Sequence, residues 1–416
     1  MAQLSDDVFA AGDRLMPVDE AIALLRARVA PVAGTERLPL VEADGRVLAE
    51  RVVAPLDLPV FDNSAVDGYA VRHADLSAGG ETTLPVVGRV AAGGRAETLA
   101  PGAAMRIFTG APAPAGADTI FMQEDARVSG DGRVVLPAGL KRGANLRPRG
   151  EDLARGAVAL EAGRRLTPQD VALAAALGLT HLDVRRRLRA AVFSTGDEIV
   201  SPGAPLGPAQ LYDSNRFVLQ ALLRRLNCEV SDLGALRDDR AAIRAALTAA
   251  AASHDLLLTS GGVSLGEEDH VKAAVEEAGS LAFWRLAIKP GRPVAMGVVG
   301  GAPFIGLPGN PVAVFVTFAA VARPLIAALT GAREDDLPRL RARAGFSYSK
   351  KPGRREYVRA RLVAGADGAA VAEKHDVEGA GVITSLTRTH GLVELDEATT
   401  SVAPGDPVAF IDYAAL

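Results

Sequence analysis

Cysteine, strong net charge and uninterrupted apolar runs are all scarce in this chain. Among its 416 residues there is one cysteine, Cys228, which excludes an internal disulfide framework and is typical of a reducing compartment. The formal net charge of −4, with a pI near 6.0, argues against nucleic acid as the main partner, because nucleic-acid binding usually requires a basic face.

No segment is typical of a signal peptide or of a membrane span. Residues 1–15 are acidic and lack an apolar core. The longest apolar stretch starts at Val312, but Arg323 and Pro324 interrupt it, so we expect a buried core helix there. We therefore expect a cytoplasmic protein with neither a membrane nor nucleic acid among its partners.

Several catalytic fingerprints are also missing. The chain has no G-x-x-x-x-G-K-[ST] and no G-x-G-x-x-G, and its six histidines show no zinc spacing. Residues 262–266 do match the G-x-S-x-G of a hydrolase nucleophile elbow. However, the strand before them is expected to stop near Thr259, several residues before Ser264, and no convincing histidine partner follows. We do not expect Ser264 to be a nucleophile.

The periodicity of the sequence divides the chain into four parts. Short valine-rich runs between Gly and Pro predict a β domain over 46–150, which is inserted into an N-terminal α+β domain made of 17–45 and 151–187. Residues 188–330 alternate strand and helix, which predicts a doubly wound parallel sheet. Residues 331–416 are β-like again. The sequence thus predicts a multidomain protein of class α/β plus β.

The most informative stretch is 254–270, HDLLLTSGGVSLGEEDH. A buried strand is expected to end at Thr259, and Ser260-Gly261-Gly262 follow it, before an amphipathic helix. Glycines at a helix N-terminus let backbone N–H groups approach an oxyanion. The adjacent acids 267–269 suit a shared hard cation such as Mg²⁺. This stretch predicts an anion site with a metal.

Four other loops are expected to meet the glycine loop, because ligands of a parallel α/β sheet bind beyond the carboxyl ends of its strands. These loops carry acids at 197–198 and 238–239, cations in KPGRP (289–293) and the turn PGNP (308–311). Lys289 and Arg292, with Arg285 on the same segment, are predicted to clamp an oxyanion. For any one acid, a helix cap is an equally good interpretation.

Eight motifs occur together in one order, including FDNSAVDGYA (61–70), RPRGED (147–152), TSGGVSLGEED (259–269) and GLPGNP (306–311). In this combination the chain resembles the MoeA and gephyrin E-domain family of molybdopterin molybdenumtransferases. The resemblance runs from about Pro17 to the C-terminus. TSGGVS alone is shared with molybdopterin adenylyltransferases and CinA-like proteins.

The resemblance implies an enzyme that inserts molybdate into adenylated molybdopterin and releases AMP, with Mg²⁺ as the metal. It also implies a MogA-like α/β module, a C-terminal domain resembling a β-barrel, and a homodimer. In that homodimer the active site is composite, so that Asp67 and Asp152 of one subunit reach the module of the other. A transient contact with a molybdopterin adenylyltransferase is a further expectation.

The family's functional residues carry over onto matching positions of this chain. The expected catalytic residues are Asp67, Asp152, Glu198 and Lys289. The expected substrate-binding residues are Thr109, Ser260, Gly261, Gly262, Ser264, Arg285, Arg292, Pro308 and Pro311. The expected metal ligands are Asp238 and Asp269. Arg285 and His270 depart from the family, where lysine and tyrosine are frequent at these positions.

Two alternatives stay open at this point. A molybdopterin adenylyltransferase shares the α/β module but does not need the segments at 46–150 and 338–416. A non-catalytic pterin-binding scaffold would not need the acids at 67, 152, 238 and 269, all of which are present.

Overall fold

The computed structural model describes residues 15–262, 270–333 and 336–416, which fall into two compact units. The larger unit contains residues up to 49, 163–167 and everything from 182 onward. The smaller unit contains 50–162 and 168–181. The finer division into four domains stays a prediction.

A seven-stranded sheet forms the centre of the larger unit. Its strands, in spatial order, are β1 (Leu15–Met16), β19 (Gly279–Leu286), β21 (Pro293–Val299), β22 (Ala302–Leu307), β18 (Leu256–Ser260), β14 (Arg189–Thr195) and β17 (Glu229–Leu236). Strands β22, β18, β14 and β17 are parallel, as the alternation of strand and helix predicts.

One strand runs against the predicted direction. Strand β21 is antiparallel to both β22 and β19, whereas the sequence pattern predicts parallel strands throughout. The reason is local: Gly300 and Gly301 have φ values of +55° and +87°, and two residues of positive φ close a tight hairpin. Because β21 is antiparallel to both of its neighbours, β19 and β22 run in the same direction. Both strands therefore end at the same edge of the sheet.

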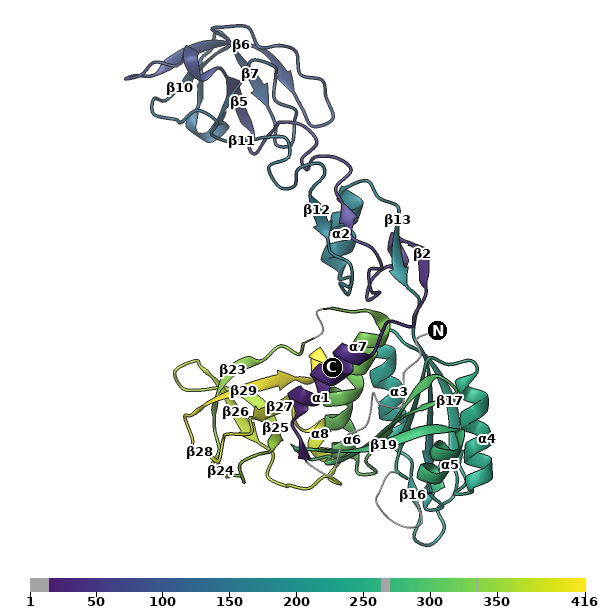
Figure 1. Cartoon of the computed structure of the whole chain (residues 1–416). Helices are drawn as coiled ribbons and strands as arrows, with labels where there is room; N and C mark the ends of the chain where they lie inside the picture. The colour runs from purple at the N-terminus through teal and green to yellow at the C-terminus, as the bar shows by residue number, and fades with distance from the viewer. Residues whose placement is uncertain (1–14, 263–269, 334–335) are drawn as a thin grey trace. The chain divides into compact units, whose positions relative to one another are not determined.

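Helices cover both faces of this sheet, so it is doubly wound (Figure 1). Helices α4 (Arg240–Ala251) and α5 (His270–Ala278) pack on one face through Ile243, Leu247 and Val271. The other face packs against α1 (Val18–Arg28), α3 (Asn215–Arg225), α6 (Pro311–Thr317) and α7 (Arg323–Thr330). Cys228 lies buried on this second face, and burial raises the pKa of its thiol to about 12.

Within the described residues, one helical stretch is long and apolar enough to cross a membrane, Pro311–Thr330, with a mean hydropathy of 2.1. It is 89% buried inside the protein, where α6 and α7 are joined by a π-helical segment, Phe318–Ala322. The stretch is therefore a core helix, as its interruption by Arg323 and Pro324 predicts.

The C-terminal part of the larger unit is a closed five-stranded barrel. Its strands, in order around the barrel, are β25 (Arg355–Ala364), β26 (Ala370–Lys374), β23 (Leu340–Ala344), β29 (Pro407–Asp412) and β27 (Gly391–Leu395), which pairs with β25 again. Strand β20 (Ile288–Lys289) comes between β19 and β21 in the sequence, and it pairs in parallel with β25 of the barrel. The loop that carries Lys289 is thereby attached to the barrel.

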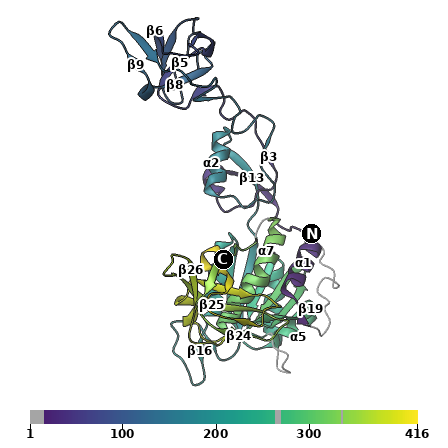
Figure 2. The same ribbon diagram turned by 90° about the vertical axis from the view of Figure 1, so that its left-hand side faces the viewer.

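The smaller unit is built on a six-stranded sheet (Figure 2). The order is β8 (Thr119–Met122), β5 (Gly68–Val71), β7 (Ala104–Ile107), β6 (Thr82–Val90), β10 (Arg133–Leu136) and β9 (Arg127–Val128). Two apolar clusters pack on this sheet, around Ile107 and Phe121. The unit also contains helix α2 (Pro168–Ala176).

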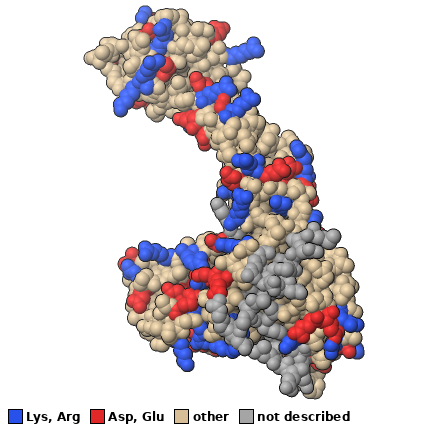
Figure 3. Space-filling model, viewed as in Figure 1, with Lys and Arg blue, Asp and Glu red and all other residues tan. Residues whose placement is uncertain are grey.

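Acidic and basic side chains are mixed on the face of the molecule in Figure 3, in keeping with the net charge of −4.

Candidate functional site

Five loops meet at one edge of the central sheet, which we call the crest. Strand registers place Ser194 beside Ser260, and Ser260 beside Leu307, so the loops that follow these strands start side by side. Strand β17 ends beside Thr195, and the hairpin of β19 and β21 delivers KPGRP to the same edge. The convergence of loops predicted from the sequence is therefore present.

The glycine loop at the crest needs glycine for steric reasons. Gly262 has a φ of +63°, and a Cβ there would lie 2.6 Å from both Thr195 Oγ1 and Val271 Cγ2. The N–H of Gly261 already donates to the Leu307 carbonyl at 3.1 Å. Gly261 therefore holds the loop against β22, and of the two glycines Gly262 is the better placed to offer its N–H to an anion.

Asn215, the first residue of α3, ties two crest loops together, and sequence reasoning missed it. Its Nδ2 donates to Ser260 Oγ at 2.8 Å and to the Gly309 carbonyl at 2.6 Å, while Ser260 Oγ donates to the Pro308 carbonyl at 3.2 Å. The available signal was the motif LYDSN (211–215), a polar helix start directly after a short strand.

Four buried side-chain oxygens at or next to the crest have no hydrogen-bond partner among the described residues. They are Ser194 Oγ, Thr195 Oγ1, Asn215 Oδ1 and Thr259 Oγ1. Buried polar atoms are nearly always satisfied in native proteins, so unpaired oxygens at a loop crest call for a partner such as water, a ligand or an ion. This observation came from the structure alone.

Two predicted acids of the α/β module, Glu198 and Asp238, lie on loops of the crest. Glu198 lies folded over its own loop, since a Cβ on Gly196 would be 2.5 Å from its Oε2. Asp238 is partly buried just after β17, and its neighbour Asp239 caps α4 by accepting from the N–H of Ala242 at 2.7 Å.

Two predicted residues, Ser264 and Asp269, lie outside the described residues. No group of three or more metal-ligating side chains occurs in the part of the chain that the structure describes. Because Asp269 is not among the described residues, this result does not test the predicted metal pair, Asp238 with Asp269.

Lys289 is held in place by two partners on the barrel. Its Nζ lies 3.1 Å from Glu356 Oε2 and 3.1 Å from the hydroxyl of Tyr348, which itself donates to Glu356 at 2.8 Å. Burial alone would lower the pKa of Lys289, but these two hydrogen bonds outweigh it and raise the pKa above its ordinary value. Lys289 is therefore a fixed cation at neutral pH.

A cavity of about 300 Å³ opens between this lysine and the barrel, and we call it the Lys289 cavity. It is lined by Lys289, Pro290, Gly291, Tyr348, Tyr357, Val358, Arg359, Lys374, His375, Glu378, Gly379 and Ala380. Arg359 is buried, and its guanidinium donates to Ser385 Oγ at 3.1 Å and to the Gly379 carbonyl at 3.2 Å. Burial lowers the pKa of Arg359 from its ordinary value, yet arginine keeps its charge at neutral pH. Lys289, Arg359 and Lys374 thus bring three positive charges to a cavity large enough for a small ligand.

The other predicted clamp residues lie elsewhere on the crest. Arg285 is paired with Pro293 across the β19–β21 hairpin, and Arg292 closes that hairpin by accepting the N–H of Leu286 at 2.9 Å. Neither arginine lines the Lys289 cavity. Pro311 starts α6. The substrate contacts predicted for these residues stay predictions.

The smaller unit holds the remaining predicted residues. One oxygen of Asp67 accepts both the backbone N–H and the hydroxyl of Thr109, at 2.8 and 2.7 Å. These bonds, the backbone one first, hold the pKa of Asp67 below its ordinary value. Asp152 is exposed, and its backbone N–H donates to the Leu58 carbonyl at 3.0 Å. Asp67 is thus an oriented, ionised carboxylate.

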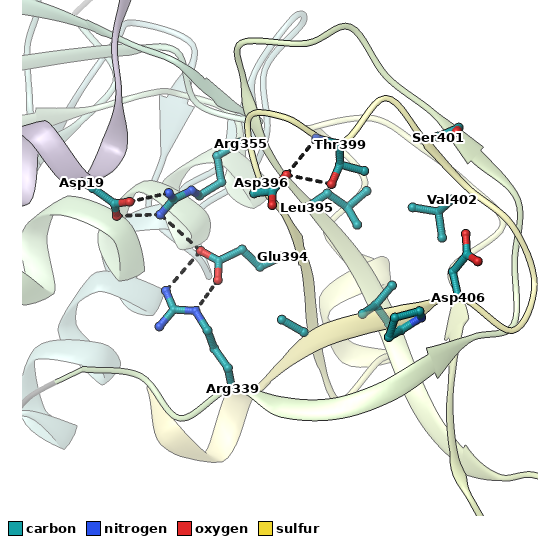
Figure 4. Close-up of a pocket in the computed structure, with 13 residues that line it drawn as sticks. Asp19, Arg339, Arg355, Glu394, Leu395, Asp396, Thr399, Ser401, Val402 and Asp406 are labelled. Atoms are coloured by element: carbon teal, nitrogen blue, oxygen red, sulfur yellow. Dashed lines mark hydrogen bonds and ion pairs between the residues drawn. The ribbon is translucent and has the colours of Figure 1, made fainter.

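A larger cavity of about 580 Å³ lies at another part of the barrel (Figure 4). There Arg355 bonds to Asp19 at 2.7 Å and to Glu397 at 3.2 Å, while Glu394 pairs with Arg339 and Arg355. Asp19 belongs to α1, so this ion-pair network joins α1 to the barrel. Four carboxylates and two arginines line this cavity, whereas three cations and one carboxylate line the Lys289 cavity, so the larger cavity is the poorer anion site.

The comparisons with known proteins cover nearly the whole chain. Residues 16–178 match the family described as MoeA N-terminal region (domain I and II), residues 191–328 a probable molybdopterin binding domain, and residues 341–413 the MoeA C-terminal region (domain IV).

Two relatives and one solved structure show the extent of the similarity. A molybdopterin molybdenumtransferase of Haemophilus influenzae is 40% identical over 90% of this chain and 93% of its own length. The molybdopterin molybdenumtransferase 2 of Mycobacterium tuberculosis is 39% identical over 88% of this chain and 92% of its own. The crystal structure of the molybdopterin biosynthesis MoeA protein from Pyrococcus horikoshii has a TM-score of 0.80 at 30% identity, covering 96% of this chain and 100% of the other.

Proposed function

The chain belongs to the MoeA family of molybdopterin molybdenumtransferases, and from this premise we propose that it inserts molybdate into adenylated molybdopterin with release of AMP. It is accordingly a transferase of molybdenum cofactor biosynthesis. The observation that carries the proposal is the pairing, at one sheet edge, of a glycine loop with unpartnered oxygens and a cation-lined cavity.

The glycine loop supports binding of the adenylate phosphates. Gly262, two residues after β18, has no side chain to cover its backbone N–H, and Asn215 fixes the loop through Ser260. The oxygen donors of the crest, Asp238 and Asn215 Oδ1, suit a hard cation, and with Asp269 they would hold Mg²⁺. When bound, this ion would neutralise phosphate charge.

The Lys289 cavity supports binding of the tetrahedral oxyanion. Molybdate carries two negative charges, and Lys289, Arg359 and Lys374 present cations to one small space. Lys289 cannot turn away easily, because Glu356 and Tyr348 hold its Nζ. A preorganised cation stabilises charge that develops as the phosphoanhydride breaks, and needs no reorganisation to do so. We propose that Glu198, on the loop after β14, orients water or pterin.

Three further expectations complete the proposal. We propose a homodimer in which Asp67 and Asp152 of one subunit complete the site of the other. We also propose a transient contact with the adenylyltransferase that makes the substrate, and a cytoplasmic location. The dimer is tested by light scattering, where a mass near the 43.0 kDa of one chain across micromolar concentrations would exclude it.

One assay separates this proposal from its alternatives. Purified protein is mixed with adenylated molybdopterin, molybdate and Mg²⁺, and AMP is measured. Molybdate-dependent AMP release is the expected result. In a parallel reaction with ATP and molybdopterin, transfer of AMP to molybdopterin would instead identify an adenylyltransferase, and binding without turnover in either reaction would identify a scaffold.

A further inference from the structure

The Lys289 cavity contains its own anion. Among the described residues that line it, Lys289, Arg359 and Lys374 carry positive charge, and Glu378 is the one carboxylate. Glu378 Oε1 lies 2.8 Å from Lys374 Nζ, four residues earlier in the chain. The Lys374 side chain is 19% exposed and that of Glu378 is 59% exposed, so the lysine lies inside and the carboxylate lies at the opening.

The cations that line the Lys289 cavity also act electrostatically on the Glu378 carboxylate. Its pKa is held below the ordinary value by the bond to Lys374, with through-space contributions from Lys374, Lys289 and Arg359. The same three cations that would attract molybdate therefore already act on this carboxylate.

The backbone around Glu378 is fixed above the cavity. The Arg359 guanidinium donates to the carbonyls of Val377 and Gly379 at 3.3 and 3.2 Å, on either side of the glutamate. The segment is thus held to the cavity wall while the Glu378 side chain stays largely exposed. Rotation of that side chain alone would release Lys374, with no movement of the backbone.

We propose that Glu378 is an internal counterion that competes with the oxyanion for Lys374 and so sets the affinity of the cavity. This inference rests on the proposed binding of molybdate in the Lys289 cavity. An incoming dianion takes over Lys374, and Glu378 turns toward solvent. Because the ion pair is more than half exposed on the glutamate side, its strength is moderated by water. Removing the carboxylate should therefore tighten binding by about 3- to 10-fold rather than by several orders of magnitude.

The test measures molybdate binding to the full-length protein by isothermal titration calorimetry. Glu378→Gln should lower the Kd by about 3- to 10-fold and make the Kd more sensitive to salt, since the site then carries more net positive charge. Glu373→Gln is the matched control, because Glu373 pairs with Arg361 on the same barrel and does not line this cavity. It should leave the Kd unchanged. In a Lys374→Met background the effect of Glu378→Gln should shrink, as expected for two coupled residues.

Three outcomes would overturn the inference. They are a Kd for Glu378→Gln within twofold of wild type or weaker, an equal change in the Glu373→Gln control, and absence of measurable binding by both wild type and Glu378→Gln. A Lys289→Met variant separates this failure from failure of the proposed function. If Lys289→Met binds molybdate as tightly as wild type, the cavity is not the oxyanion site; if it binds more weakly while Glu378→Gln changes nothing, only the role of Glu378 is wrong.

Discussion

Lys289→Met should damage both stability and activity, and the two effects can be separated. The substitution keeps most of the apolar stem but removes the ammonium group from Glu356, whose side chain is 1% exposed. A hydrogen bond to a charged group contributes about 1.5–3 kcal/mol. The lysine is 48% exposed, and Glu356 keeps the hydroxyl of Tyr348, so we expect a smaller loss of about 1–2 kcal/mol. For a unit as large as the one that carries Lys289, that corresponds to a fall in Tm of about 2–3 °C.

Activity should fall much further than stability. Loss of a preorganised group that faces developing charge typically costs about 10²- to 10³-fold in rate. We therefore expect molybdate-dependent AMP release by Lys289→Met to fall by about that factor at a temperature where the variant is folded. The assay is initial-rate AMP release at saturating Mg²⁺, measured beside a thermal melt of the same sample.

A second substitution separates the structural role of Lys289 from its role in catalysis. Glu356→Gln in the Lys289→Met background removes the buried charge that the first substitution left with Arg354, at 3.5 Å, as its remaining cation. The double variant should regain at least half of the lost Tm and none of the lost activity. If activity returned with stability, Lys289 would be a structural residue. Activity of the single variant within about threefold of wild type would equally refute its role at the oxyanion.

Three further predictions concern the loops and the smaller unit. Asn215→Ala should weaken AMP binding about 10-fold, because it frees the glycine loop from its two hydrogen bonds; calorimetry with AMP measures this, and unchanged affinity would contradict it. Gly262→Ala should destabilise the protein by about 1–3 kcal/mol through strain and a clash, whereas Gly368→Ala, with a φ of +79° but open space, should cost less in the same denaturation experiment. Thr109→Ala should raise the pKa of Asp67 toward its ordinary 3.8 in an NMR titration. The stability that Thr109 adds through Asp67 is present above that pH and is lost as the pH falls through the lowered pKa, so Thr109→Ala should matter least in strong acid.

Much of the α/β module could be predicted because its signals are local. Branched apolar runs such as residues 189–195 and 256–260 are buried strands, and the helices between them show the expected periodicity. The position of the crest follows from strand direction alone. The reversal at Gly300 and Gly301 also had a local signal, a glycine pair between two apolar runs, but the strand–helix alternation outweighed it.

The Lys289 cavity could not be predicted, because it depends on contacts between distant residues. Lys289 and Glu356 are 67 positions apart in the chain, and β20 brings them together by pairing with β25 in the barrel. Nothing near either residue indicates its partner. The role of Asn215 could not be predicted for a related reason: its hydrogen bonds reach Ser260 and Gly309, which lie on two other loops.

A tetrahedral oxyanion should bind in the Lys289 cavity, near the loop that would hold the adenylate. Tungstate has the shape and charge of molybdate, and its tungsten atom gives a strong anomalous X-ray signal. Crystals of the wild-type protein soaked with tungstate and AMP should show an anomalous peak among Lys289, Arg359 and Lys374, inside the cavity. A peak elsewhere, or a peak that persists unchanged in Lys289→Met crystals, would contradict binding of the oxyanion by Lys289.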